Sequence, residues 1–260
     1  MTQIGVRAFE DNVIHISDLN VDYFEVAVRP EYNTIGQIIP ETNLKAYERI
    51  KDKIRGIHGA FWSHGINFMD ETLVEKNRHA IELALNAADC FENCEYVNFH
   101  PGYLVNKKCG IENLYALMSE YDDKRLTLEI VPFLAYPERY EFPLYTVEDF
   151  CKLKNKTGKE ILIDVGHAAI TSRIKNYNPL EYCNQLIREL NINIMHVADN
   201  DASDDGCNDF HMHIGEGEVP IEEILAQNKN QIKYATLEVN GLNTEDINVV
   251  RNWLSGLNQP

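Results

Sequence analysis

The segment 194–220, IMHVADNDASDDGCNDFHMHIGEGEVP, contains residues whose types and spacing suit a metal site. His196 lies near the end of a short apolar run, and Asp209 and His211 follow further along the chain. In an extended segment Asp209 and His211 would point to the same face, because strand side chains alternate with period two. A carboxylate beside imidazoles is a ligand set for a divalent transition metal. An acidic surface loop with accidental histidines is the alternative interpretation.

Similar residues stand at or near the ends of other strand-like segments. They are His58 in IHGAF, His100 in NFHPG, Glu129 in TLEIV, Asp164 and His167 in IDVGHA, and Glu238 in TLEV. Each alone would be read as a hydrogen-bonded core residue or a paired carboxylate. Together with His196, Asp209 and His211 they make nine predicted ligands, and buried carboxylates at one site repel each other unless cations offset them. Because one zinc ion uses ~4 ligands, we expect two or three ions, zinc or manganese.

The elements that would position these residues alternate between strand and helix patterns. Strands are predicted at 4–9, 23–28, 54–61, 96–100, 126–131, 161–165, 192–197 and 234–239. Helices are predicted at 44–54, from Glu71 with Asp70 as N-cap, at 111–118, from a Thr146 capping box, from Pro179, from Pro220, and from Thr244 as cap to about Leu254. Eight such units predict an α/β fold, a single (β/α)8 TIM barrel that forms one domain over 1–260. In this fold, reacting groups lie at the carboxyl ends of the strands, where the predicted ligands stand.

Composition limits the classes of partner. The net charge of −17 over 260 residues disfavours nucleic acid, unless a local cationic site offsets it. No apolar run reaches the ~20 residues of a membrane span, and the N-terminus lacks a signal pattern. The six cysteines form no CxxC pair. We therefore expect a cytoplasmic protein without a membrane partner; the oligomeric state is left open.

Three motifs resemble a known family. NFHPG at 98–102, D-x-x-H at 164–167 and D-x-H-x-x-x-G-E-G at 209–217 are similar to those of the endonuclease IV-type apurinic/apyrimidinic endonucleases, a branch of the xylose isomerase-like TIM barrels. The resemblance covers essentially the whole chain and implies three zinc ions. It implies that His58 and His100 hold one ion and that Glu129 bridges to a second. Asp164, His196 and Glu238 would complete the second ion, and His167, Asp209 and His211 would hold the third.

The sequence departs from that family in the segments that would meet DNA. IVPFLAYPERYEFP follows the strand of Glu129, where the family has Asn and a Gly-rich loop. Phe61 and Trp62 stand where a DNA-inserting tyrosine is expected, and the loop after the second strand offers Arg29 and Tyr32. Arg29, Phe61 and Trp62 are the predicted substrate-binding residues. Abasic DNA, a small phosphoester and a sugar stay candidate substrates.

Three functions remain open at this point. The first is a metal-dependent phosphodiesterase in which an activated water attacks phosphorus in line. The second is a sugar isomerase or epimerase with one ion on Glu129, Asp164, His196 and Glu238, the two glutamates moving protons. The third is a non-catalytic metal-binding protein. The first is favoured because the second leaves four predicted ligands without a role; in either enzyme Glu129 and Glu238 are the predicted catalytic residues, and His213 is predicted not to bind metal.

Overall fold

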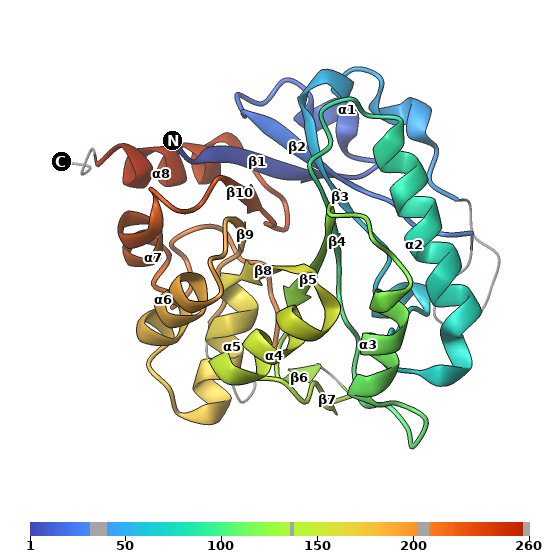
Figure 1. Ribbon diagram of the computed structural model, residues 1–260. Coiled ribbons are helices and arrows are strands. Elements are labelled where there is room, and N and C mark those ends of the chain that lie inside the picture. The colour runs from blue at the N-terminus through green and yellow to red at the C-terminus, as the bar shows by residue number, and fades with distance from the viewer. Residues whose placement is uncertain (32–40, 136–137, 202–207, 257–260) are drawn as a thin grey trace.

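Eight parallel strands close into a barrel in the computed structural model, which describes residues 1–31, 41–135, 138–201 and 208–256 (Figure 1). The strands are β1 (Gln3–Ala8), β2 (Tyr23–Ala27), β3 (Ile54–His58), β4 (Tyr96–Phe99), β5 (Leu126–Ile130), β8 (Glu160–Asp164), β9 (Ile194–Val197) and β10 (Tyr234–Leu237). Each pairs in parallel with its neighbours in the chain, and β1 closes on β10. The predicted TIM barrel is confirmed, with strand ends shifted by a few residues.

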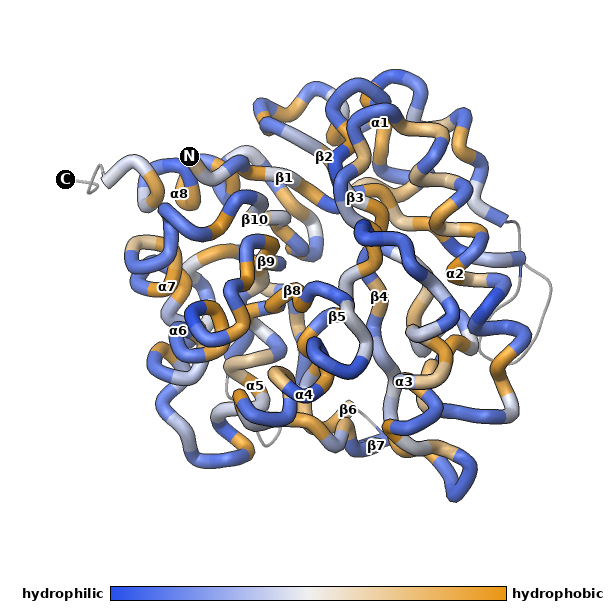
Figure 2. The backbone as a smooth tube through the Cα atoms, in the orientation of Figure 1, coloured by the Kyte–Doolittle hydropathy of each residue, from blue (hydrophilic) through white to orange (hydrophobic). Residues whose placement is uncertain are grey.

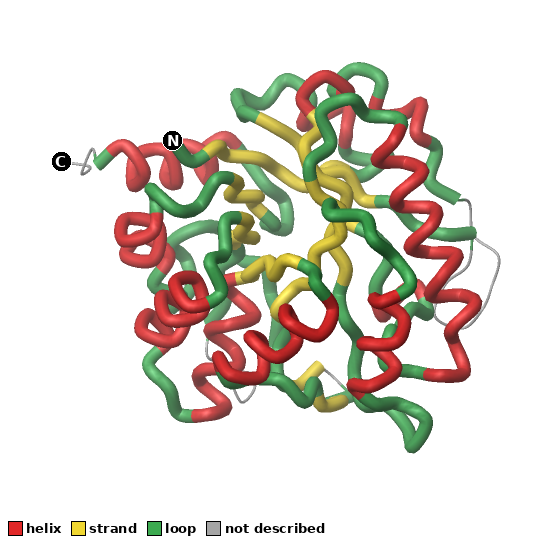
Figure 3. The backbone as a smooth tube through the Cα atoms, in the orientation of Figure 1, coloured by secondary structure: helices red, strands yellow, loops and turns green. Residues whose placement is uncertain are grey.

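The helices surround the barrel (Figure 3). They are α1 (Val13–Ile16), α2 (Val74–Asp89), α3 (Ile111–Ser119), α4 (Val147–Thr157), α5 (Val165–Lys175), α6 (Pro179–Glu189), α7 (Ile221–Asn228) and α8 (Thr244–Ser255). Three predicted starts are confirmed. The Asp70 side chain accepts from Thr72 N ahead of α2, the Thr146 capping box opens α4, and Pro179 is the first residue of α6.

Two helix predictions are wrong. The predicted helix at 44–54 is two 3-10 turns, Leu44–Tyr47 and Lys51–Lys53. The first turn fits the three-residue spacing of Leu44, Tyr47 and Ile50, the repeat of a 3-10 helix. Thr244 does not cap α8. Asn243 does, its side chain accepting from Glu245 N and Asp246 N, and Asn is the stronger N-cap residue.

Several elements were not predicted from the sequence, among them the short helix α1, helix α5 and a hairpin. Helix α5 begins directly after β8, and its residues from Val165 to Ser172 are all buried. A helix that is covered on every side has no polar stripe, so it lacks the periodicity by which helices are recognised. The segment after β5, read as a loop, contains a short antiparallel hairpin of β6 (Leu134–Ala135) and β7 (Tyr140–Glu141).

Hydrophobic side chains fill the space between the strands and the helices, and hydrophilic positions lie mainly on the outer turns and loops (Figure 2). Tyrosine rings close the amino end of the barrel interior. Tyr23 and Tyr96 begin β2 and β4 and are fully buried. A Cβ on Gly5 or Gly56 would lie 2.3 Å or 2.2 Å from these rings, so glycine on the adjacent strands makes room for them.

Candidate metal centre

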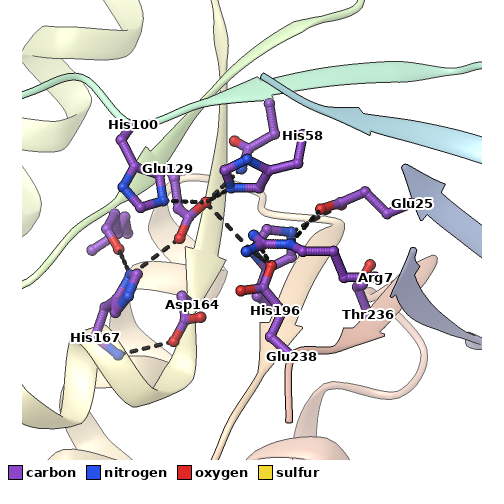
Figure 4. Close-up of polar contacts among 12 residues, drawn as sticks. Arg7, Glu25, His58, His100, Glu129, Asp164, His167, His196, Thr236 and Glu238 are labelled. Atoms are coloured by element: carbon purple, nitrogen blue, oxygen red, sulfur yellow. Dashed lines mark hydrogen bonds and ion pairs between the residues drawn. The ribbon is translucent and has the colours of Figure 1, made fainter. Parts of the chain in front are cut away.

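Toward the carboxyl ends of the strands, the side chains that alternation directs into the barrel are polar. Interior side chains of a barrel lie in levels contributed by alternate strands. Two residues beyond the level of the tyrosine rings, strands β2, β4, β8 and β10 place Glu25, Asn98, Asp164 and Thr236 in the interior. The other four strands then place Arg7, His58, Glu129 and His196. A barrel interior is ordinarily filled by branched apolar residues, so these two polar levels mark the site (Figure 4).

Glu129 lies at the centre of the predicted ligands. Its Oε2 atom is 3.4 Å from His58 Nε2, 3.3 Å from His100 Nε2 and 3.4 Å from His196 Nδ1. Its Oε1 atom is 3.1 Å from His167 Nδ1. The carboxylate is buried, and its two oxygens together lie close to four of the predicted ligand histidines (Figure 4).

Helix geometry explains the Asp164-x-x-His167 motif. Asp164 is the last residue of β8 and the N-cap of α5, and its Oδ1 atom accepts from His167 N at 2.9 Å. Through this hydrogen bond, the first turn of α5 keeps the His167 ring near the end of β8. The bond uses only one oxygen of the Asp164 carboxylate. Oδ2 of Asp164 is buried without a hydrogen-bond partner and faces the site.

A loop supplies Asp209 and His211, and it is not the extended segment that the spacing suggested. His211 has φ +49°, in the left-handed region, so the period-two argument is wrong although the two side chains do meet. Asp209 Oδ2 lies 2.8 Å from His211 Nε2 and 3.0 Å from His167 Nε2. Asn200 holds this backbone, because its Oδ1 accepts from Phe210 N and His211 N and its Nδ2 donates to Asp209 at 3.2 Å.

Three histidines are oriented by backbone carbonyls. The Nδ1 atoms of His58, His167 and His211 lie 2.8 Å, 3.1 Å and 2.5 Å from the carbonyls of Gly59, Ile130 and Glu238. When Nδ1–H donates to a carbonyl, the lone pair of Nε2 is left for a metal ion. The Nε2 atoms of all three point into the site.

The donor set fits divalent ions. All nine predicted ligands fall into groups whose ligand atoms lie within 4.8 Å of one another: His58, His100 and Glu129; Glu129, Asp164 and His167; His167, Asp209 and His211; and a group of His58, His196 and Glu238 with Glu25. Five of these ligand atoms are buried without a hydrogen-bond partner: His58 Nε2, Glu129 Oε1, Asp164 Oδ2, His196 Nδ1 and Glu238 Oε1. Such atoms are costly to bury, and shared cations would satisfy them. Metal binding itself stays a prediction.

The pKa values show how strongly these groups interact. Burial raises the pKa of Glu129, but the adjacent His100 and His196 outweigh it and hold that pKa well below its ordinary value. Burial raises the pKa of Asp164. Burial lowers the pKa of His211, but Asp209 outweighs burial and raises it to about 9. Burial lowers the pKa values of His167 and His196 too, but the neighbouring carboxylates outweigh it and raise them. In the absence of metal, protons on His167, His196 and His211 therefore offset part of the carboxylate charge.

Four residues that contact the predicted ligands were missed by the sequence reading: Arg7, Glu25, Asn98 and Asn200. Arg7 contacts Glu238 and lies 3.6 Å from Glu25, so one basic residue does stand among these carboxylates. Asn98 Nδ2 donates to Glu129 at 2.5 Å. The signal for Arg7 and Glu25 was a charged residue at an interior position of an apolar strand, in IGVRAF and YFEVAV.

The predicted substrate-binding residues border the site unequally. Phe61 packs against His58 and His100, with ring centroids 5.6 Å and 5.1 Å away. Phe61 and Arg29 line a cavity of about 480 Å³ that reaches His58. Trp62 packs instead against Tyr140 of the hairpin. Tyr32 lies outside the described residues.

A second cavity, of about 460 Å³, shares Phe9 with the first as a lining residue. Arg7, His211 and Glu238 line it. His213 does not point into the site. Its Nδ1 lies 3.0 Å from Asp246 Oδ2, and it joins no group of ligand atoms among the described residues.

Comparisons with known proteins place these observations in a family. The family model described as xylose isomerase-like TIM barrel matches residues 13–249. No curated protein matches by sequence. None of the described helices has the length and apolarity that a membrane crossing requires.

Solved structures with different activities share the fold. A D-tagatose 3-epimerase-like protein is 20% identical, with TM-score 0.74 and 98% of each chain covered. Endonuclease IV from Thermus thermophilus is 16% identical, with TM-score 0.69, covering 98% of this chain and 99% of its own. A 3-keto-D-glucoside 4-epimerase from E. coli is 13% identical, with TM-score 0.62 and 99% of each chain covered. These identities show the fold alone.

Proposed function

The chain belongs to the xylose isomerase-like TIM barrel family, and from this premise we propose that it is a metal-dependent phosphodiesterase that resembles endonuclease IV. The family and its solved members support an enzyme in general. One observation carries the choice of a phosphodiesterase. The His167–Asp209–His211 group adjoins Glu129 and Asp164 through His167, and the His58–His100 pair also adjoins Glu129, so more ligands lie together than one ion needs.

Two to three divalent ions, zinc or manganese, would be held by these residues. His58 and His100 would hold one, with Glu129 shared with the second. Asp164, His196 and Glu238 would complete the second, and the third would lie on His167, Asp209 and His211. Ions bound there would polarise the phosphoryl oxygens and activate a water nucleophile.

The surrounding residues position the reacting groups. Glu129 fixes the distance between adjacent ligand groups, because its two oxygens contact histidines of different groups. Phe61 covers the His58 and His100 rings and excludes water from that side. Arg7 holds the Glu238 carboxylate in place and adds a positive charge at the wall of the 460 Å³ cavity.

A small phosphoester is the substrate class that we favour over duplex DNA. The net charge of −17 opposes binding of a polyanion, and the two cavities beside the site have the size of a single small ligand. Abasic DNA stays the alternative from the resemblance. An abasic-DNA enzyme should bind its duplex with an affinity that falls steeply as the salt concentration rises. The acidic surface of this chain instead predicts weak DNA binding whose affinity changes little with salt.

The second candidate is a sugar isomerase or epimerase with one ion. Two of the similar structures are an epimerase and an epimerase-like protein, and Glu129, Asp164, His196 and Glu238 suffice for one ion. Under this proposal the His167–Asp209–His211 group would be dispensable.

The discriminating experiment compares His211→Ala with His213→Ala in zinc- and manganese-loaded protein. Hydrolysis of a small phosphodiester, incision of an abasic duplex, and interconversion of ketoses and phosphorylated sugars are assayed together. We expect phosphodiester hydrolysis that His211→Ala abolishes and His213→Ala keeps. Sugar interconversion that survives His211→Ala, without hydrolysis, would establish the isomerase instead.

A further inference from the structure

His196 is oriented in the opposite sense to three of the other predicted ligand histidines. His58, His167 and His211 present Nε2 to the site, with Nδ1 against a backbone carbonyl, although Nδ1 of His167 also lies 3.1 Å from Glu129 Oε1. His196 presents Nδ1 to the site, 2.7 Å from Glu238 Oε1 and 3.4 Å from Glu129 Oε2. Its Nε2 atom lies 2.9 Å from a carboxylate oxygen, Oε2 of Glu25.

Three residues hold the Glu25 carboxylate in place: His196, Tyr96 and Arg7. Glu25 is completely buried, one level below His196 in the barrel. Its Oε2 also accepts a hydrogen bond from the Tyr96 hydroxyl at 2.6 Å. The Tyr96 hydroxyl is 3.2 Å from Thr236 Oγ1, which in turn is 2.7 Å from the Tyr23 hydroxyl. The network continues down to the tyrosine level that closes the barrel.

Arg7 places one positive charge beside two buried carboxylates, those of Glu25 and Glu238. Its guanidinium lies 3.6 Å from Glu25 and contacts Glu238 (Figure 4). A buried carboxylate near a metal site would add negative charge, and Arg7 offsets it. Oε2 of Glu25 already faces the Tyr96 hydroxyl and His196 Nε2, and Oε1, which has no hydrogen bond, faces the Arg7 guanidinium at 3.6 Å. A cation therefore already stands beside Oε1, which places Glu25 to orient His196 and not to bind an ion itself.

We propose that Glu25 is a positioning residue that keeps Nε2 of His196 protonated and thereby presents the Nδ1 lone pair to the second ion. This inference rests on the metal site of the proposed function. A carboxylate that accepts the second N–H of a ligand histidine fixes the ring, selects the tautomer and raises ligand basicity. Backbone carbonyls do this for His58, His167 and His211, and for His196 the role falls to Glu25.

The test uses Glu25→Gln, which keeps the shape and loses the charge, and Tyr96→Phe, which removes one hydroxyl from the same network. Metal affinity is measured by chelator competition with Zn²⁺ and Mn²⁺. We expect one ion to bind about 10- to 100-fold more weakly in Glu25→Gln. The ion on His167, Asp209 and His211 should keep its affinity, because the contacts of Glu25 are with His196, Tyr96 and Arg7. Tyr96→Phe should weaken the same ion by less.

A second readout follows the tautomer directly. Imidazole ¹⁵N shifts of His196 are recorded with Zn²⁺ bound and in alkaline metal-free protein. We expect an Nε2–H form in the wild type and loss of its exchange-protected proton in Glu25→Gln. An Nδ1–H form in the wild type, or unchanged affinity and spectrum in Glu25→Gln, would overturn the proposal. A wild type that binds no ion but shows the Nε2–H form would refute the proposed function while leaving the Glu25–His196 pairing intact.

Discussion

Six of the predicted ligands lie in two regions that are held in different ways, while His100, His167 and Glu238 follow the ends of β4, β8 and β10. His58, Glu129, Asp164 and His196 stand on barrel strands, and all four are buried, the most exposed being Glu129 and His58 at 1%. Asp209 and His211 stand on a loop after β9 and are partly exposed. The strand region is fixed by sheet pairing, whereas the loop region depends on Asn200 and on a left-handed residue.

The difference separates what the fold provides from what this chain adds. Under the proposals above, the strand region together with Glu238 would hold one ion, which the isomerase alternative requires. The loop region would supply the additional group that favours a phosphodiesterase. Loops carry specificity on a rigid barrel because they can change without disturbing the sheet. The choice between the two proposed functions therefore depends on the loop region.

Removing the charge of Glu129 should weaken metal binding in both regions at once and have the largest effect on metal content and turnover. Glu129→Gln keeps the shape but offers no charged oxygen to either neighbouring group. We expect the loss of at least one bound ion and a fall in turnover by about three orders of magnitude or more. Elemental analysis and phosphodiester hydrolysis measure this, and near wild-type turnover would remove Glu129 from its central role.

Asn200→Ala should break the loop region alone. It removes the acceptor for Phe210 N and His211 N and the donor to Asp209. We expect affinity for the ion on His167, Asp209 and His211 to fall about 10- to 100-fold, and the free energy of unfolding to fall by about 1–3 kcal/mol from the unpaired amides. Chelator competition and denaturant unfolding measure the two effects. Equal weakening of all ions would contradict a division into two regions.

The strand region could be predicted from sequence for a physical reason. In a (β/α)8 barrel the end of each strand reaches the same mouth, so ligand types at separate strand ends imply proximity without knowledge of packing. Arg7 and Glu25 share the barrel levels of Glu129 and Asp164, and they were missed because neither stands in a motif of predicted metal ligands. Period two counted forward from Gly5 and Tyr23 would have placed both inside the barrel.

The loop region was predicted with the right residues and the wrong geometry. The left-handed φ of His211 depends on Asn200, and its ring depends on the Glu238 carbonyl. These are tertiary contacts between segments that no periodicity connects. Helix α5 was missed for a related reason, because complete burial removes the polar face that marks a helix in a sequence.

Metal binding in the loop region should strengthen as pH rises. Asp209 raises the pKa of His211 to about 9, although burial opposes this, so His211 carries a proton at neutral pH that an ion must displace. Affinity for this ion should therefore rise up to about tenfold per pH unit from pH 7 to about 9 for each proton displaced, then level off. Competition titrations across this range measure the slope. A flat profile would mean that the ion does not bind at His211.

His213→Ala should have the smallest effect and sharpen the boundary of the loop region. His213 lies two residues from His211 but contacts Asp246, which separately accepts from Ile214 N and caps α8. We therefore expect full metal occupancy and unchanged turnover. The hydrogen bond to Asp246 raises the pKa of His213, so its contribution to stability is present below the unfolded pKa of about 6.5 and is lost as pH rises through the raised folded value. His213→Ala should thus lower Tm slightly at pH 6 and not at pH 9. Loss of a bound ion in this variant would instead show that the metal site extends beyond His211.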